Sequence, residues 1–317
     1  MTRSILITSR SFGTGNEDTC HTLENAGFTI IRAESQHDLH ELSAALPHVE
    51  AWIAGTGPIT EDHLAHAPRL KVIARYGVGY DAVDLAAATA HGIIVTNTPG
   101  ANSESVADLA LTLLLTALRM VKAGDNAVRR ADWVVIRGRE ISSLRIGVAG
   151  FGRIGRSFAA RVSGLGASVL AYDPLISEVE TLPKRHARAA SFIELSACDA
   201  VSLHAPGGQR LVDATWLHSV RGMTLVNTAR ADLVDESATA DAIRSGLLTS
   251  YAADTLDTES HGSSESPLLA DDLADRVIIT PHLGAQTVQA IDRMGVAAVN
   301  NVLLVLNGRS ALNPVTV

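Results

Sequence analysis

The stretch RIGVAGFGRIGR, residues 145–156, joins an apolar run to a glycine-rich turn and then to a helix-like segment. Residues 146–149 are typical of a buried parallel strand, and residues 154–162 are typical of a helix. The glycines between them follow the spacing G-x-G-x-x-G: Gly150, Gly152 and Gly155. A second apolar run, residues 168–172, ends in Asp173. This order indicates a dinucleotide-binding unit, against the alternative of an ordinary turn with an incidental acid.

Each part of this unit has a physical role in binding a dinucleotide. The first glycine allows a tight turn, the second lets the backbone approach a pyrophosphate, and the third lets helix and strand pack closely. The helix N-terminus, at Arg153 and Ile154, offers N–H groups and partial positive charge to the phosphates. Asp173 lies about 20 residues beyond the glycines, where a carboxylate binds the adenosine ribose. We therefore expect the cofactor to be NAD.

Length and composition limit the class of protein. The 317 residues suggest two domains, and an apolar content of 46% is ample for packed cores. The formal net charge of −8 disfavours nucleic acid as a partner. Cys20 and Cys198 lie far apart without metal-binding or redox spacing, so we expect no metal site and a reducing compartment. With no signal-peptide pattern and no apolar stretch long enough for a membrane span, we expect a cytoplasmic protein and no membrane partner.

Residues 1–100 alternate strand-like and helix-like runs, which predicts a parallel sheet covered by helices. The strand-like runs are residues 5–8, 29–32, 51–54, 72–74 and 93–96, and the helix-like runs include 18–26, 38–45 and 60–65. The fourth strand leads into the loop RYGVGYD, residues 75–81, and ligands bind at such strand ends. Arg75 supplies charge there, and Gly77 and Gly79 would let backbone N–H groups face a ligand. A glycine turn with a surface arginine is the alternative for this loop taken alone.

A second alternating set begins at residue 145, with strand-like runs at 146–149, 168–172, 200–203, 224–227, 251–254 and 277–280. Before it, a helix apolar nearly all round is expected from Asn102 or Ser103 to about residue 118, either connecting the domains or facing a second subunit. A last helix at about 287–306 is expected to return to the first domain. The sequence thus predicts an α/β protein of two doubly wound parallel-sheet domains. A Rossmann cofactor domain at 101–285 would be inserted in a flavodoxin-like substrate domain at 1–100 plus 286–317.

The strand ends of the second set carry polar residues: Asp173, His204, Arg230, Asp254 and His282. An arginine such as Arg230 can hold a carboxylate bidentately, and a histidine such as His282 is a natural proton donor near neutral pH. Glu259 lies in a nearby loop, and a carboxylate beside an imidazole raises its pKa and fixes its tautomer. Each residue alone has an ordinary explanation, as surface charge, core histidine or loop acid. Together they indicate hydride transfer with an acid–base histidine.

The chain resembles the D-2-hydroxyacid dehydrogenase family over essentially its full length, and within it the catalytic part of phosphoglycerate dehydrogenases. The motifs that carry the resemblance are RYGVGYDAVDL at 75–85, NTPGANSESVADLAL at 97–111, GVAGFGRIGR at 147–156, LHAP at 203–206, NTARADLVDE at 227–236, AADTLDTES at 252–260 and TPHLGAQT at 280–287. The ordered arginine, glutamate and histidine are far more specific than the glycine motif.

The resemblance implies a role for individual residues. Arg230 would bind the substrate, Glu259 would pair with the histidine, and His282 would be the acid–base residue. The nicotinamide carboxamide would contact Asp254. Further cofactor contacts would come from the LHAP and NTAR motifs: His204, Ala205, Pro206, Thr228 and Ala229. The loop with Arg75 would bind the substrate carboxylate through backbone N–H groups: Gly77, Val78 and Gly79.

Some features depart from the family pattern and leave the substrate open. The loop Gly207–Gln209 is shorter than usual, and Gly55 stands in the stretch where phosphoglycerate dehydrogenases tend to carry a phosphate-binding arginine. The function predicted is an NAD-dependent interconversion of a 2-oxo acid and a D-2-hydroxy acid, such as phosphoglycerate, hydroxypyruvate, glyoxylate or a phosphonate-bearing 2-oxo acid. The alternative is an NAD(H)-sensing, corepressor-like binding protein. A formate dehydrogenase is disfavoured because that relative has glutamine in place of the pairing acid. We also expect a homodimer that uses the helix near 104–119.

Overall fold

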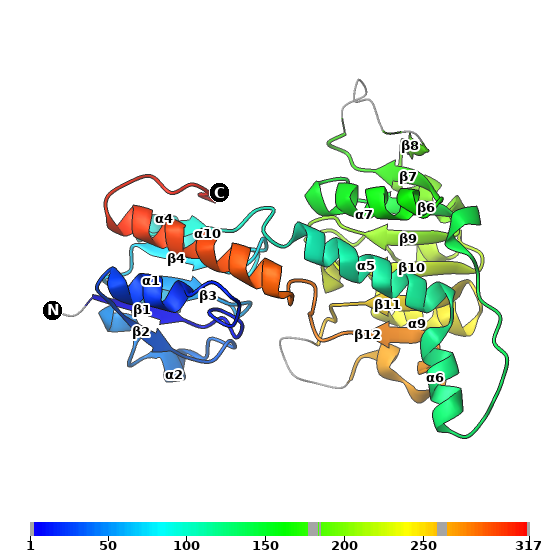
Figure 1. The fold of residues 1–317 in the computed structure, drawn as a ribbon, viewed down its shortest axis with the longest axis horizontal. Helices are drawn as coiled ribbons and strands as arrows, with labels where there is room; N and C mark the ends of the chain where they lie inside the picture. Colours follow the sequence, from blue (N-terminus) through cyan, green and yellow to red (C-terminus); the bar gives the residue numbers. More distant parts are fainter. Residues whose placement is uncertain (1–2, 177–182, 184, 259–264, 316–317) are drawn as a thin grey trace. The chain divides into compact units, whose positions relative to one another are not determined.

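The computed structural model describes the chain except for residues 1–2, 177–182, 184, 259–264 and 316–317. The chain forms two compact units, each an α/β layered structure around its own sheet (Figure 1). Unit 1 comprises Met1–Ser105 and Ala285–Val317, and unit 2 comprises Val106–Gly284. The chain therefore leaves unit 1, forms unit 2 and returns.

Unit 1 is built on a five-stranded sheet in which all neighbouring strands are parallel, in the order β2-β1-β3-β4-β5. The strands are β1 Arg3–Ile7, β2 Phe28–Arg32, β3 Val49–Ala54, β4 Val72–Arg75 and β5 Ile94–Thr96. The helices are α1 Thr19–Asn25, α2 Leu39–Leu42, α3 Glu61–Ala65, α4 Leu85–Ala90 and α10 Val288–Leu306. This strand order is that of flavodoxin-like folds, as predicted.

Alternate residues of β1 point to opposite faces of this sheet, because successive side chains of a strand point to opposite sides. Ile5 and Ile7 pack with residues of α1 and α10 on one face. Leu6 packs with residues of α2, α3 and α4 on the other. Figure 1 shows α10, drawn in orange to red, running along the sheet of unit 1, where it contacts β3 and β4. The last helix thus packs in unit 1.

Unit 2 is built on a seven-stranded parallel sheet in the order β12-β11-β10-β9-β6-β7-β8. The strands are β6 Arg145–Ala149, β7 Ser168–Tyr172, β8 His186–Arg188, β9 Ala200–Leu203, β10 Met223–Asn227, β11 Leu248–Ala253 and β12 Val277–Ile279. The helices are α5 Ser103–Leu118, which starts in unit 1, α6 Val121–Arg129, α7 Arg153–Gly164, α8 Ala214–Leu217 and α9 Glu236–Arg244. The order reverses between β6 and β9, which is the topological switch point of a Rossmann fold.

Helices cover both faces of the unit 2 sheet, as the two cores on either side of β6 show. Val148 packs with residues of α5 and α7, and the next residue, Ala149, packs with residues of α8 and α9. The predicted class of two doubly wound parallel-sheet domains is therefore confirmed. Among the described residues, no helix is both long and apolar enough to span a membrane.

The structure corrects some of the predicted elements. The strand predicted at 251–254 has both ends wrong, because β11 starts at Leu248 and ends at Ala253, before Asp254. The predicted runs also omit β8, a short edge strand of sequence HAR with little apolar character. The unit boundaries fall at 105/106 and 284/285, close to the expected 100/101 and 285/286. That the units serve as substrate and cofactor domains stays a prediction.

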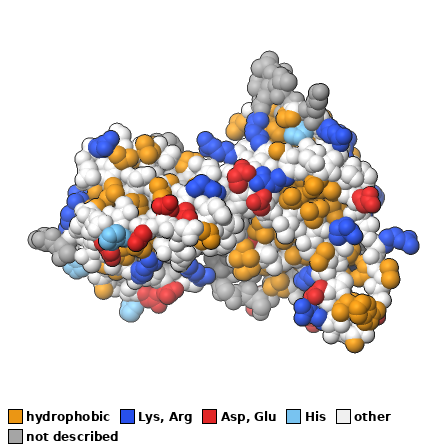
Figure 2. Space-filling view, in the orientation of Figure 1, with side chains coloured by type: hydrophobic (Ala, Val, Ile, Leu, Met, Phe, Trp, Pro, Cys, Tyr) orange, Lys and Arg blue, Asp and Glu red, His pale blue; other side chains and the backbone are white. Residues whose placement is uncertain are grey.

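Charged side chains of both signs lie on the face of the protein that Figure 2 shows. Figure 2 shows acidic and basic groups interspersed over the visible face, with apolar groups between them. The segment 131–140, which follows α6, is mostly exposed and has neither helix nor strand over residues 132–140. Its apolar side chains include Trp133, which is 83% exposed, and Val135, which is 95% exposed.

Candidate active site

The glycine-rich turn after β6 is packed too tightly for side chains at two of its three glycines. Gly150 has φ +87°, and a Cβ atom on it would lie 2.5 Å from the carbonyl of His204. A Cβ atom on Gly155 would lie 2.0 Å from the carbonyl oxygen of Gly150. Gly150 therefore supplies the turn, and Gly155 lets α7 approach the turn, as the sequence pattern predicts.

Gly152 differs from the other two glycines because the space beside it is open. It precedes α7 at the N-cap with φ −72°, and a Cβ atom there would have no heavy atom within 4 Å. No side chain caps the N-terminus of α7, which begins at Arg153. The first turn of this helix thus presents N–H groups and a partial positive charge toward open space, which suits an anionic phosphate group.

Asp173 follows β7 and is bonded to the glycine-rich turn. Its Oδ2 accepts a hydrogen bond from the backbone N–H of Phe151 at 2.7 Å, and its Oδ1 accepts one from Leu175 at 2.8 Å. The backbone N–H of Gly150 donates to the carbonyl of Tyr172 at 2.8 Å. The acid therefore lies beside the glycines at the carboxyl ends of two adjacent strands, the position expected of a ribose-binding carboxylate.

The imidazole of His204, after β9, is part of the protein interior. Nε2 lies 2.9 Å from the hydroxyl of Ser202, and the ring packs on Phe158 with centroids 5.0 Å apart. Burial lowers the pKa of His204 to about 3, so the ring is neutral near pH 7. Its carbonyl and the N–H of Ala205 are the groups next to Gly150. The backbone from His204 to Pro206, rather than the imidazole, therefore borders the glycine-rich turn.

Arg230 stands in a turn that a buried asparagine organises. Asn227, the last residue of β10, has no exposed surface. Its Oδ1 accepts from the N–H of Ala229 at 3.0 Å, and its Nδ2 donates to the carbonyl of Arg230 at 2.8 Å. The Arg230 guanidinium donates through Nη1 to the carbonyl of Ala229 at 2.9 Å. These hydrogen bonds fix the direction in which the backbone leaves β10, and they therefore determine where Arg230 lies.

The short glycine loop after the LHAP motif packs on the same turn. The N–H of Gly208 donates to Oδ2 of Asp232 at 2.6 Å, and Gly208 has φ +95°. A Cβ atom on Gly207 would lie 2.9 Å from Asp232 and 3.2 Å from Cγ of Arg230. The shortened loop therefore ends against the Arg230 turn, and glycine at position 207 allows this close approach.

Asp254 is a buried carboxylate after β11, with 2% of its surface exposed. Oδ1 accepts from the hydroxyl of Thr280 and from the N–H of Leu283 at 2.7 Å, and Oδ2 accepts from the N–H of Gly284 at 2.7 Å. Burial raises the pKa of Asp254, while these hydrogen bonds and the charge of His282 act to lower it. The carboxylate thus holds the loop that follows β12.

His282 lies in that loop with φ +55°, an uncommon conformation for a residue with a side chain. Its N–H lies 3.2 Å from the carbonyl oxygen of Asp254 and 3.0 Å from that of Thr280. The Asp254 contacts hold both sides of this residue, so the surrounding structure imposes the backbone strain, as is common at functional sites. Glu259, the predicted partner of His282, lies outside the described residues.

The predicted substrate loop belongs to unit 1 and follows β4. Arg75, 6% exposed, donates through Nε to the carbonyl of Gly79 at 3.1 Å, and Asn97 donates to the carbonyl of Val78 at 2.8 Å. Gly77 has φ +141° with nothing within 4 Å of a Cβ atom. The side chains thus hold the loop by its carbonyl groups.

Of the predicted polar residues of unit 2, the structure describes Asp173, His204, Arg230, Asp254 and His282, and each follows a strand at the carboxyl edge of one sheet. It also presents two buried hydroxyls without partners among the described residues, those of Thr228 and Thr255. With the open space at Gly152, these unsatisfied groups fit a polar dinucleotide such as NAD. Among the described residues, no group of three or more histidines, cysteines or acids could hold a metal ion.

Sequence patterns missed two residues that organise this edge. Asn227 and Thr280 were each included only as the last residue of a predicted strand and the first residue of a family motif, with no role of their own. Each is a polar residue at the end of an apolar run, and this is the signal that could have identified them. The predicted contacts of Arg153, Ile154, Ala205, Pro206, Thr228 and Ala229 with a cofactor stay predictions.

Comparison with known proteins gives matches over both units. Residues 111–284 match the family model described as the D-isomer specific 2-hydroxyacid dehydrogenase, NAD binding domain. A D-3-phosphoglycerate dehydrogenase of Mycobacterium leprae is 39% identical over 292 residues, which cover 88% of this chain and 53% of the relative. The chain thus spans about half the length of that relative. A hydroxypyruvate reductase of Thermotoga maritima is 30% identical over 280 residues, covering 86% of this chain and 90% of the relative.

Solved structures show the same architecture. The TT0316 protein from Thermus thermophilus superposes with a TM-score of 0.87 at 34% identity, with 99% of this chain and 100% of that chain covered.

Proposed function

The chain belongs to the D-isomer specific 2-hydroxyacid dehydrogenase family, and we propose that it interconverts a 2-oxo acid and a D-2-hydroxy acid with NAD(H). One observation carries this proposal: three adjacent strands, β10, β11 and β12, lead at one edge of the sheet to Arg230, Asp254 and His282. An arginine suited to a carboxylate and a histidine suited to proton transfer therefore follow strands of the sheet that carries the glycine-rich turn.

The reaction divides between the cofactor and the residues of the chain. NAD(H), when bound, supplies or accepts the hydride at the substrate's C2 atom. Arg230 holds the substrate carboxylate and stabilises negative charge that grows on the C2 oxygen during reduction. His282 donates the proton to that oxygen, and Glu259 favours the protonated imidazole. Asp254 holds the His282 loop and would accept a hydrogen bond from the nicotinamide carboxamide. The loop Gly77, Val78 and Gly79 would offer N–H groups to the substrate, although the N–H of Gly77 donates to the carbonyl of Arg75 at 3.0 Å in this structure.

A turnover assay tests this function. The protein is mixed with NADH and, in separate reactions, hydroxypyruvate, glyoxylate, 3-phosphohydroxypyruvate and phosphonopyruvate. We expect NADH oxidation with at least one of them and formation of the D-hydroxy acid. NADH binding in calorimetry without turnover of any 2-oxo acid would contradict the proposal and favour the dinucleotide-sensing alternative.

We also infer a homodimer, with the exposed apolar segment 131–140 and helix α5 as its contact surface. Trp133 and Val135 expose more than four fifths of their surface, and burial of such groups by a second copy would be favourable. Sedimentation at micromolar concentration should give twice the mass of one chain, and Trp133→Ser with Val135→Ser should shift it toward one chain. A wild-type monomer would contradict the inference.

The free thiols of Cys20 and Cys198 support a reducing, cytoplasmic location.

A further inference from the structure

The loops after β1, β2 and β3 of unit 1 are joined by a buried hydrogen-bond network. The hydroxyl of Thr8, just after β1, accepts from Nε1 of Trp52 at 2.9 Å and from the N–H of Gly55 at 3.3 Å. The same hydroxyl lies 2.6 Å from Nε2 of His37, which is 2% exposed and has φ +61°. Nδ1 of His37 donates to the carbonyl of Pro58 at 3.1 Å. These hydrogen bonds connect the three loops at the carboxyl edge of the sheet to one another.

Arg10 lies in the first of these loops and is an exposed residue. It lies three residues after β1, and its Nε donates to the hydroxyl of Ser35 at 2.9 Å. Ser35 is 8% exposed, so the anchor is buried while the arginine is not. None of the residues that the structure describes bonds to the two terminal amino groups of Arg10. The guanidinium is therefore oriented by one bond and presents its remaining donors to a ligand, which favours bidentate binding of an anion.

The loop after β3 packs so closely on its neighbours that two of its positions, Gly55 and Gly57, have no room for a side chain. A Cβ atom on Gly55 would lie 2.7 Å from the carbonyl of Thr8, and one on Gly57 would lie 2.4 Å from the carbonyl of Ser35. The backbones of the loops after β1 and β2 thus fill the space that larger residues would need. Neither Gly55 nor Gly57 could therefore be replaced by a charged residue without moving these loops, and Arg10 supplies the charge in the loop after β1.

Arg75 is a second cation at the same edge. Burial is the main cause that lowers the pKa of His37 to about 4, and the positive charge of Arg75 contributes to the same shift. Arg75 therefore lies within electrostatic reach of His37, which is two residues from the Ser35 that anchors Arg10. Arg75 is also the last residue of β4, two strands from β1 in the sheet, so the carboxyl edge carries two arginines.

We infer that Arg10 is a specificity-determining residue, which selects 2-oxo acids that carry a second anionic group at the end remote from the C1 carboxylate. The group is a phosphonate, a phosphate or a second carboxylate, because all three accept two parallel hydrogen bonds from a guanidinium. The inference rests on the proposed function, in which the Arg75 loop binds the carboxylate next to the reacting carbon. Substrates with an uncharged end, such as hydroxypyruvate, would form no such hydrogen bonds with Arg10, so Arg10 would not favour their binding.

The test compares Arg10→Ala with the wild-type protein on matched substrates. Phosphonopyruvate, 3-phosphohydroxypyruvate and oxaloacetate carry the second anionic group, and hydroxypyruvate and glyoxylate do not. For at least one of the first three, kcat/KM should fall about 10- to 100-fold, the effect of losing a charge-assisted hydrogen bond. For hydroxypyruvate and glyoxylate it should change less than about threefold. The substrate with the largest fall identifies which anionic group is bound. Arg10→Lys should recover part of the loss, because a lysine keeps the charge but not the fork.

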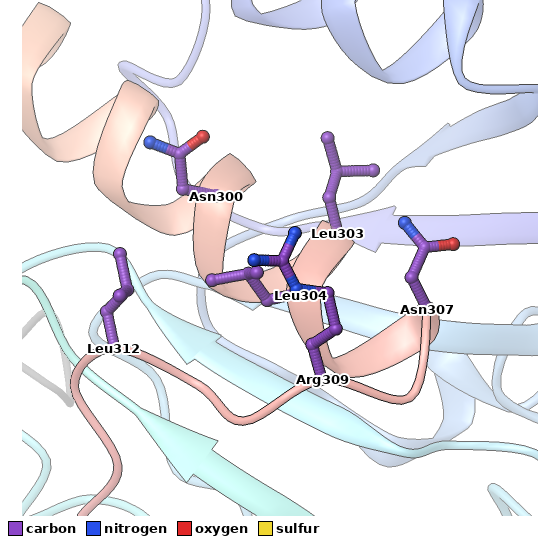
Figure 3. A pocket seen from close by; sticks show the side chains of 6 residues that line it. All are labelled: Asn300, Leu303, Leu304, Asn307, Arg309 and Leu312. Atoms are coloured by element: carbon purple, nitrogen blue, oxygen red, sulfur yellow. The ribbon is translucent and has the colours of Figure 1, made fainter.

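Arg309→Ala is the matched control, because it removes one exposed positive charge from the same unit. Figure 3 shows Arg309 beside a pocket that it lines with Leu304 and Leu312, just beyond the C-terminal end of α10. The N-terminal part of α10 contacts the loop after β1, where the N–H of Glu17 donates to Asp292 at 2.9 Å. At 1.5 Å per residue the helix places Arg309 roughly 20 Å or more from that contact. The control variant should therefore leave every kcat/KM within about twofold of wild type, since a Debye length is about 10 Å.

The outcomes separate this inference from the proposed function. Equal losses on all substrates, or no loss on any, would overturn the role of Arg10 while leaving the dehydrogenase function intact. If the wild-type protein reduces no 2-oxo acid, the proposed function fails. Calorimetric binding of phosphonopyruvate then still tests Arg10: weaker binding to Arg10→Ala than to wild type and Arg309→Ala supports an anion site, and equal binding refutes it.

Discussion

The glycine-rich turn provides a prediction in which stability and cofactor binding separate. Gly152 and Gly155 lie three residues apart, and each can be replaced by alanine with the addition of one methyl group. At Gly152 that methyl group enters open space, at a φ of −72° that alanine adopts without strain. At Gly155 it meets the carbonyl oxygen of Gly150 at 2.0 Å. The two variants therefore perturb different properties.

The expected magnitudes follow from these surroundings. Gly155→Ala forces either α7 or the turn after β6 to move, and such overpacking costs about 1–3 kcal/mol in the free energy of unfolding. Gly152→Ala exchanges a fair N-cap residue for a poor one, while it also restricts the unfolded chain, so the net change should stay within about 1 kcal/mol. The new methyl group would, however, occupy the space that a pyrophosphate must approach. Loss of one charge-assisted hydrogen bond there weakens NADH binding about 10- to 100-fold.

Urea unfolding and calorimetric titration with NADH measure the two properties on the same samples. We expect Gly152→Ala to unfold near the wild-type midpoint but to bind NADH weakly, and Gly155→Ala to unfold at a clearly lower urea concentration. Wild-type NADH affinity in Gly152→Ala would refute the assignment of the open space to the phosphates. Wild-type stability in Gly155→Ala would refute the packing argument.

Three further predictions concern the cofactor, the pH dependence and the active site. Asp173 should repel a 2′-phosphate, so kcat/KM should be higher with NADH than with NADPH, and equal values would contradict its role. In the folded protein His37 has a pKa of about 4 against 6.5 as its ordinary value, so the unfolded chain binds a proton first as the pH falls. The free energy of unfolding should therefore fall by about 3 kcal/mol between pH 6.5 and 4, and this fall should be smaller in His37→Gln. Parallel pH profiles of the unfolding free energy for the wild type and His37→Gln would refute this. Arg230→Ala should lower kcat and raise KM, and Arg230→Lys should restore only part of each loss. Glu259→Gln should lower the pH above which reduction fails, and an unshifted pH profile would exclude the proposed coupling of Glu259 to His282.

The architecture was predictable because it depends on patterns that short-range physics imposes. The apolar runs of 146–149 and 168–172 correspond to β6 and β7 within one residue, since buried parallel strands must be apolar on both faces. Strand β8 has the sequence HAR and lies at the edge of the sheet, so its pairing with β7 leaves almost no sign in composition. The start of β11 at Leu248 was missed for a similar reason, because its polar residues Thr249 and Ser250 interrupt the apolar run.

The site was only partly predictable, because its geometry depends on long-range contacts. The positions of Arg230, Asp254 and His282 after parallel strands placed them at one edge in advance. The positive φ of His282 and the three hydrogen bonds that Asp254 accepts could not be inferred, because they join the residue that follows β11 to the loop after β12. The interior position of the His204 ring was equally hidden, since a histidine in a motif can face a ligand or the core.

The most direct test of the account is the steady-state rate of NADH-dependent reduction by His282→Ala, measured beside the wild type on the best 2-oxo acid of the panel. Calorimetric NADH affinity is measured on both proteins, so that loss of the cofactor site is separated from loss of chemistry. We predict that kcat falls about 10²- to 10⁴-fold, the contribution of a positioned general acid, while the Kd for NADH stays within about threefold. A kcat near that of the wild type would contradict the assignment of His282 as the proton donor.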